Sequence, residues 1–131
     1  MGNIDPKSLG IPNINFSIDI SDPERQKKYL KQRIARGFDD TETWGLNVVI
    51  VDFVLPRLRL YKELASPKIE WCGFDNDEEE ALGMEGVVDK MIFAFETIKR
   101  DDDGECVSSE DWDKVQEGLR LFAEYFTKLW W

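Results

Sequence analysis

The chain has 131 residues, of which 42% are hydrophobic and 12% aromatic, a size and composition typical of one packed domain rather than of a disordered chain. Its formal net charge of −10 disfavours direct nucleic-acid binding, which depends on Lys and Arg displacing counterions from phosphates. The absence of His removes the commonest general base and nearly all zinc chemistry, and no glycine-rich phosphate loop occurs, so we expect no enzyme activity, no cofactor and no metal.

The N-terminal residues 1–22 are predicted to form an extended arm. Within it Ile14, Phe16, Ile18 and Ile20 alternate with polar side chains, which is the period of a half-buried strand. A lone strand is marginal, so it needs a partner. The best internal partner is residues 69–74, which would make a minimal two-stranded ribbon, and the alternative is a strand of another chain.

A first helix is predicted for residues 23–36. Ser21 and Glu24 have the spacing of a capping box, Pro23 suits the first turn, and Gly37 ends the helix. Tyr29, Leu30 and Ile34 lie on one side, so the basic side chains face water or a partner. These basic residues are Arg25, Lys27, Lys28, Lys31, Arg33 and Arg36.

The second predicted helix, residues 41–64 with Thr41 as its cap, is apolar on every side in its first half and should be central to the core. Pro56 lies inside it, and we expect a kink or a break there. Residues 73–86 are acidic and contain several glycines, so they are predicted to form a surface loop.

Two further helices are predicted, at 84–98 and 109–129, the last with apolar residues at heptad steps. The fold class is therefore mainly α: a compact bundle of about four helices, forming a single domain with a helical core over residues 23–131. The predicted core consists of Trp44, Val51, Leu55, Met91, Phe95, Leu119, Phe122 and Phe126.

The charge is divided unevenly along the chain. Residues 1–36 carry 7 basic and 4 acidic side chains, whereas residues 37–131 carry 10 and 23. The acidic residues form two dense clusters that are candidate binding surfaces, although acidity also serves solubility alone. The clusters are Asp75, Asp77, Glu78, Glu79 and Glu80, and Asp101, Asp102, Asp103 and Glu105.

One acidic stretch partly matches a calcium-binding loop. Asp101, Asp103, Gly104 and Glu110 fit its third, fifth, sixth and twelfth places, but Lys99 stands where the first ligand should be. We predict no calcium site there. Cys72 and Cys106 match no metal or redox spacing and are expected to be buried or idle thiols.

Four stretches resemble a family of small uncharacterised proteins encoded by bacteriophages. They are residues 36–46 (RGFDDTETWGL), 53–58 (FVLPRL), 89–96 (DKMIFAFE) and 117–126 (EGLRLFAEYF), the last followed by Leu129 and Trp130. The resemblance covers about residues 25–130. Family members commonly have Asp after the Trp-x-Leu step, where this chain has Asn47. The resemblance implies expression in the cytoplasm of an infected bacterium and no particular activity.

Three functions are consistent with these features. The first is a non-enzymatic accessory protein that binds a host or phage protein through its acidic surface, as an inhibitor or a nucleic-acid mimic. The second is an assembly module that self-associates through the N-terminal arm and the terminal aromatic residues Trp130 and Trp131. The third is a small-molecule sponge that uses the basic helix. No secretory signal or apolar stretch of bilayer length occurs, so we expect an intracellular protein with no membrane partner.

Overall fold

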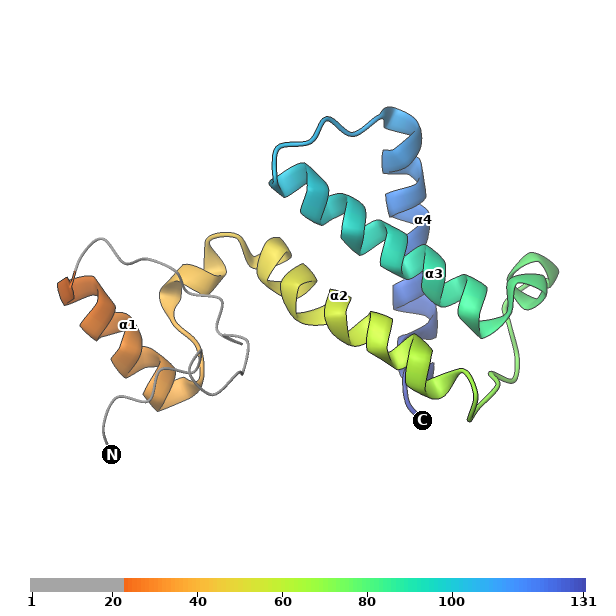
Figure 1. Ribbon diagram of the computed structural model, residues 1–131, viewed down its shortest axis with the longest axis horizontal. Coiled ribbons are helices and arrows are strands. Elements are labelled where there is room, and N and C mark those ends of the chain that lie inside the picture. Colours follow the sequence, from red (N-terminus) through yellow and green to blue (C-terminus); the bar gives the residue numbers. More distant parts are fainter. Residues whose placement is uncertain (1–22) are drawn as a thin grey trace. The chain divides into compact units, whose positions relative to one another are not determined.

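The computed structural model describes residues 23–131, which are mostly helical (Figure 1). No residue of that range lies in a β-strand, so the prediction of a mainly α fold with four main helices is confirmed. The helices are α1 (Pro23–Arg36), α2 (Leu46–Ala65), α3 (Asp77–Asp102) and α4 (Ser109–Tyr125), with 3-10 turns η2 (Asp40–Thr43) and η3 (Phe126–Lys128). The chain divides into two compact units, Met1–Ile50 and Val51–Trp131, which we describe separately.

In the first unit, α1 has the predicted bounds, and Gly37 ends it with a φ of 88°. Tyr29 is buried and its ring meets that of Trp44 edge-on, with centroids 6.4 Å apart. The prediction that Trp44 belongs to the core is wrong, because its side chain is 69% exposed. Leu30 and Ile34, expected to pack beside Tyr29, are exposed as well.

The second predicted helix begins later than expected because a 3-10 turn precedes it. Asp39, not Thr41, is the cap: its carboxylate accepts a hydrogen bond from the Thr41 amide, and its own amide donates to the Glu42 carboxylate. After this turn α2 starts at Leu46 and continues through Pro56 as one helix, so the expected break does not occur. The expected kink stays a prediction.

Only one face of α2 is buried, which corrects the expectation that the helix is surrounded by core. Val51, Leu55 and Leu58 lie in the core of the second unit, whereas Phe53 and Leu60 on the same helix are about half exposed. The second unit therefore covers only part of the apolar surface of α2.

Residues 77–82 are helical, contrary to the predicted surface loop over 73–86. Asn76 caps α3, and its side-chain oxygen accepts a hydrogen bond from the Glu79 amide at 2.8 Å. Gly83, with φ 68° and ψ −179°, interrupts the helical backbone, and Met84 begins the longer part of α3. The helix predicted to begin at residue 84 therefore corresponds to the part of α3 that follows this break.

The core of the second unit is made by α2, α3 and α4. At the crossing of α3 and α4, a Cβ atom on Gly118 would lie 2.4 Å from the Lys90 carbonyl oxygen and 2.5 Å from the Ala94 Cβ atom. The face of α4 that is fully buried therefore carries Val115, Gly118, Leu121 and Tyr125. Leu119 and Phe122, predicted as core, are only partly buried, and Phe126, also predicted as core, is 59% exposed.

Residues 69–74 form no strand, so the predicted ribbon lacks this partner. They follow the surface of α4 instead: the ring of Trp71 stacks on Tyr125 with centroids 5.3 Å apart, and that of Phe74 lies 5.9 Å from it. Lys128 Nζ donates to the carbonyl oxygens of Cys72 and Gly73. The predicted strand and arm within residues 1–22 lie outside the described residues.

Candidate functional site

All ten Lys and Arg side chains of the second unit contact another group of that unit. Six form ion pairs: Arg59 with Glu96, Lys62 with Asp89, Lys90 with Glu117, Lys99 with Asp52, Arg100 with Glu105, and Arg120 with Glu124. Arg57, Lys68 and Lys114 lie over the rings of Phe53, Trp131 and Phe93, and Lys128 binds the two carbonyls named above. The cations of this unit are therefore occupied by internal contacts.

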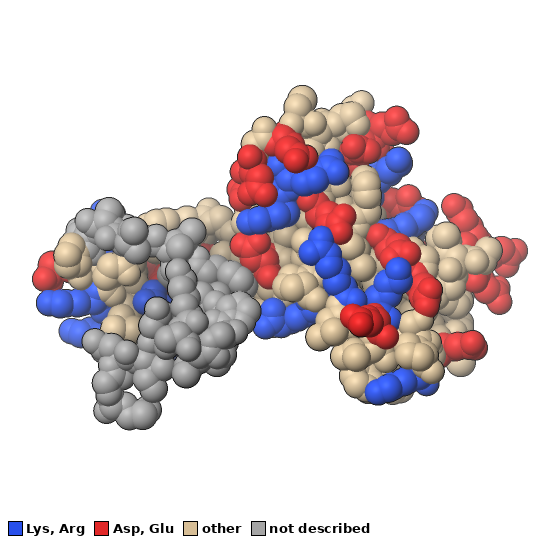
Figure 2. Space-filling view, viewed as in Figure 1, with Lys and Arg blue, Asp and Glu red and all other residues tan. Residues whose placement is uncertain are grey.

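The same unit has 20 acidic side chains, so a surplus of carboxylates remains. Figure 2 shows Lys and Arg among Asp and Glu over the middle of this unit, with further acidic side chains toward its edges. Two groups of exposed carboxylates have no Lys or Arg within 4.0 Å among residues 23–131. We call them the first acidic cluster (Asp77, Glu78 and Glu80) and the second acidic cluster (Asp101, Asp102 and Asp103).

The two acidic clusters stand at opposite ends of α3 and differ in their effect on the helix. Asp77, Glu78 and Glu80 lie in its first turn, where negative charge stabilises the helix dipole. Asp101 and Asp102 lie in its last turn, where negative charge opposes that dipole. Helix stability therefore accounts for the first acidic cluster but not for the second.

The residues between Met84 and Asp102 form about 28 Å of helix at 1.5 Å per residue. Because this separation is several times the Debye length of about 8 Å at physiological salt, the two acidic clusters act as separate charges there. A partner that engages both must extend along the whole of α3.

Three residues of the predicted acidic surface are not free. Glu105 pairs with Arg100 at 3.0 Å. Glu79 is buried, and its nearest cation is Arg120, whose Nη1 atom lies 3.7 Å from Glu79 Oε1. Asp75 is exposed but lies beside Glu124, and the hydrogen bond between the two carboxyl groups raises the pKa of Asp75.

A hollow of about 410 Å³ lies beside the first acidic cluster. Apolar side chains, among them Trp71, Phe74 and Met84, line it together with carboxylates. Glu80 belongs both to this lining and to the first acidic cluster. The hollow therefore combines an apolar surface with negative charge. Its remaining lining residues are Ser66, Ile69, Glu70, Leu82, Gly83 and Glu85.

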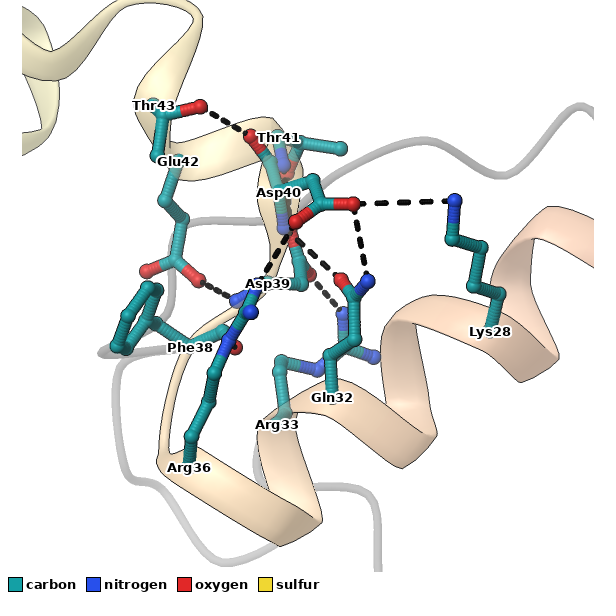
Figure 3. A network of polar contacts seen from close by, with 10 residues as sticks. All are labelled: Lys28, Gln32, Arg33, Arg36, Phe38, Asp39, Asp40, Thr41, Glu42 and Thr43. Atoms are coloured by element: carbon teal, nitrogen blue, oxygen red, sulfur yellow. Dashed lines mark hydrogen bonds and ion pairs between the residues drawn. The ribbon is translucent and has the colours of Figure 1, made fainter.

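The basic helix α1 is largely neutralised by the turn that follows it (Figure 3). Arg33 pairs with Asp39, whose side chain is fully buried, and Arg36 and Lys28 both pair with Asp40. Hydrogen bonds from Gln32 and Arg36, in that order, lower the pKa of Asp40. Lys27 contacts Glu24 at 3.6 Å. Few of the six predicted cations therefore remain for an external anion.

The predicted aromatic anchor is exposed. The side chains of Trp130 and Trp131 are 67% and 52% exposed, and Phe126 is exposed nearby in the sequence. Their backbone is held, since the Tyr61 hydroxyl donates to the Trp130 carbonyl at 3.3 Å, and Lys68 lies over the Trp131 ring.

The partial calcium-loop pattern begins inside α3 and only its middle lies in a loop. Lys99, Asp101 and Asp102 are still in the last turns of α3, and Lys99 pairs with Asp52 at 3.1 Å. A helical backbone cannot wrap these residues around an ion. The thiols of Cys72 and Cys106 are exposed, so of the two alternatives burial is excluded, and that they are idle stays a prediction. No helix among the described residues is long and apolar enough to cross a membrane.

Sequence reasoning missed Arg120 and Glu124, which meet Asp75 and Glu79 from α4. Their spacing of four residues predicts a helical ion pair, but only the fold brings that pair to the start of α3. Comparisons of the chain with protein-family models, with curated proteins and with solved structures give no match. The resemblance to bacteriophage-encoded proteins stays a prediction.

Proposed function

We propose that this chain is a non-enzymatic acidic protein that binds a protein partner through the two acidic clusters of α3. The observation that supports it most is the distribution of charge: every cation of the second unit is held internally, while many exposed carboxylates, among them all six of the two acidic clusters, have no ion-pair partner there. A partner with basic side chains would supply the missing charge. One such partner is a protein whose basic surface binds nucleic acid. The acidic clusters would then occupy that surface in place of phosphates.

The second acidic cluster gives the proposal further support. Three adjacent aspartates at the C-terminal end of a helix oppose the helix dipole and repel one another, although Asp102 and Asp103 are also attracted to Lys99. A binding role explains why charge is placed there. The hollow beside the first acidic cluster adds an apolar surface against which the stem of a partner's Lys or Arg can pack.

The resemblance noted in the sequence would place this activity in the cytoplasm of an infected bacterium. The partner would then be a host or phage protein, and direct contact with nucleic acid or membrane would have no part in it.

The test measures how fast matched triple variants associate with a partner captured from infected cells. Asp77→Asn with Glu78→Gln and Glu80→Gln neutralises the first acidic cluster, and Asp101→Asn with Asp102→Asn and Asp103→Asn neutralises the second. Each should slow association, because exposed charges steer encounter, while circular dichroism shows an unchanged fold.

The control triple is Glu63→Gln, Glu110→Gln and Asp113→Asn, which removes the same charge at exposed positions outside both acidic clusters. It should slow association much less than either cluster variant. Equal effects of all three triples would mean that net charge alone acts. An affinity that is unchanged by salt and by both cluster variants would refute the proposal.

A second candidate function, self-assembly, is favoured by the exposed aromatic side chains of Phe126, Trp130 and Trp131. With the predicted N-terminal arm they would form contacts between copies. Sedimentation over a range of concentrations tests this function, and a monomer at tens of micromolar would exclude it. The third hypothesis, a small-molecule sponge on α1, has less support because Asp39 and Asp40 already bind Arg33 and Arg36.

A further inference from the structure

Three carboxylates from different elements meet between α3 and α4. Asp75 precedes α3, Glu79 lies in its first turn, and Glu124 lies in the last turn of α4. One oxygen atom of each lies within 4.8 Å of the others. None of the three belongs to the first or second acidic cluster, and Glu79, unlike the members of those clusters, is buried.

Glu79 provides an independent observation that points to a ligand. The residue is only 3% exposed, and its Oε1 atom accepts no hydrogen bond from residues 23–131, whereas Oε2 accepts one from the Asn76 side chain. A buried carboxylate oxygen that is left without a hydrogen bond is unfavourable. The nearest cation, Arg120, directs its Nη1 atom to Glu124 Oε1 at 2.6 Å and remains 3.7 Å from Glu79 Oε1.

The charges at this point do not balance without a further cation. Asp75, Glu79 and Glu124 together carry three negative charges when ionised, and Arg120 supplies one positive charge. Lys128 belongs to the same region, but its Nζ atom is bound to the carbonyl oxygens of Cys72 and Gly73. A doubly charged ion would neutralise the remainder and provide Glu79 Oε1 with a partner.

We propose that Asp75, Glu79 and Glu124 bind a hard divalent cation, Ca²⁺ or Mg²⁺. Both ions prefer carboxylate oxygens and complete their coordination with water. Three oxygen atoms spaced evenly around Ca²⁺ at its usual distance of about 2.3–2.6 Å are about 4.0–4.5 Å apart. Spacings of up to 4.8 Å therefore need a small closure of the side chains around Ca²⁺ and a larger one around Mg²⁺. The side chain of Arg120 is about half exposed and can turn toward solvent.

The test uses the full chain after treatment with EDTA, titrated by calorimetry with CaCl₂ or MgCl₂ against NaCl of equal ionic strength. We expect one saturable equivalent and a rise in Tm. Terbium provides a second readout, because Tyr125 and the stacked Trp71 lie beside the cluster and would sensitise its luminescence. No saturable heat and no sensitised emission would refute the site.

Asp75→Asn and Glu124→Gln should each weaken cation binding by about tenfold or more, since each removes a ligand. The matched control is Asp77→Asn, an exposed carboxylate two residues from Asp75 that belongs to the first acidic cluster, and it should leave the affinity within about twofold. An equal loss in the control would show diffuse accumulation of cations around an acidic surface, which contradicts a site.

Arg120→Gln separates this proposal from the alternative that the carboxylates serve only to hold Arg120. Removing the competing guanidinium should tighten cation binding, and the added cation should restore any Tm lost by the substitution. Binding that is unchanged or lost in this variant would contradict the proposal. Because Asp75→Asn changes an exposed side chain, it provides a test that does not depend on the stability of Arg120→Gln.

Discussion

Asp75 is the residue whose ionisation we expect to oppose folding. Its hydrogen bond to Glu124 raises its pKa above the ordinary value of 3.8, so the folded state favours the protonated acid. The resulting stability is fully present below pH 3.8 and is lost as the pH rises through the higher pKa of the folded state. When both carboxyl groups are ionised, Asp75 and Glu124 repel each other.

Asp75→Asn, which imitates the protonated acid, should therefore raise Tm at pH 7 in the presence of EDTA. The gain should shrink as the pH falls toward 4, where the wild-type carboxyl becomes protonated itself. Thermal unfolding followed by circular dichroism from pH 4 to 8 measures this. A gain that is independent of pH, or a loss at pH 7, would show that the contact with Glu124 does not govern the ionisation of Asp75.

Gly118 is the residue whose substitution should be least tolerated. An added methyl group would meet the Lys90 carbonyl oxygen at 2.4 Å, and backbone cannot move aside as a side chain can. Gly118→Ala should cost about 1–3 kcal/mol in the free energy of unfolding, because α4 must move away from α3. Gly45→Ala, at a position with open space around it, should change that free energy by less than about 0.5 kcal/mol in the same urea titration.

At the scale of the element, α4 shows which of its faces is packed in the core. Leu121 is completely buried, whereas Phe126 is 59% exposed. Leu121→Ala should cost about 2–5 kcal/mol in the free energy of unfolding, and Phe126→Ala should cost less than about 1 kcal/mol. Chemical denaturation of the two variants measures the difference, and equal losses would mean that the heptad face is the packed one.

The limits of sequence reasoning are visible in the same helix. Heptad steps predicted Leu119, Phe122 and Phe126 as the core seam because large apolar residues define such a pattern. The structure instead centres the contact on Gly118, whose lack of a side chain allows the two helix backbones to approach. A pattern of hydrophobic residues cannot reveal a close approach of two helices that depends on the lack of a side chain.

Helix ends were predictable where the cap stood next to a clear pattern. Pro23 and Gly37 gave α1 its bounds, and Ser108 caps α4, which begins at the predicted residue 109. The start of α3 was missed because glycines and acidic residues favour a loop, although Asn76 and Glu79 have capping spacing. The site formed by Asp75, Glu79 and Glu124 could not be predicted, since these residues meet only through the packing of α4 on α3.

At the scale of the whole molecule, excess charge and exposed aromatic side chains predict different kinetics of binding. Deleting Trp130 and Trp131 should speed dissociation if they anchor a partner, and should barely change the salt dependence of association. Between 0.01 M and 0.15 M salt the Debye length falls from about 30 Å to about 8 Å, so binding by the acidic clusters should weaken steeply. Surface-based kinetics at several salt concentrations measures both effects, and dissociation that is unchanged by the deletion would leave the acidic clusters as the principal contact.

The two exposed thiols allow dyes to be attached near both ends of α3. Cys72 stands shortly before α3 and Cys106 shortly after it, so each lies near one of the two acidic clusters. A donor dye on one thiol and an acceptor on the other would report the separation of the helix ends, with no residue substituted. Because Gly83 interrupts α3 near its start, a change in energy transfer on binding would reveal whether a partner bends the helix at that break.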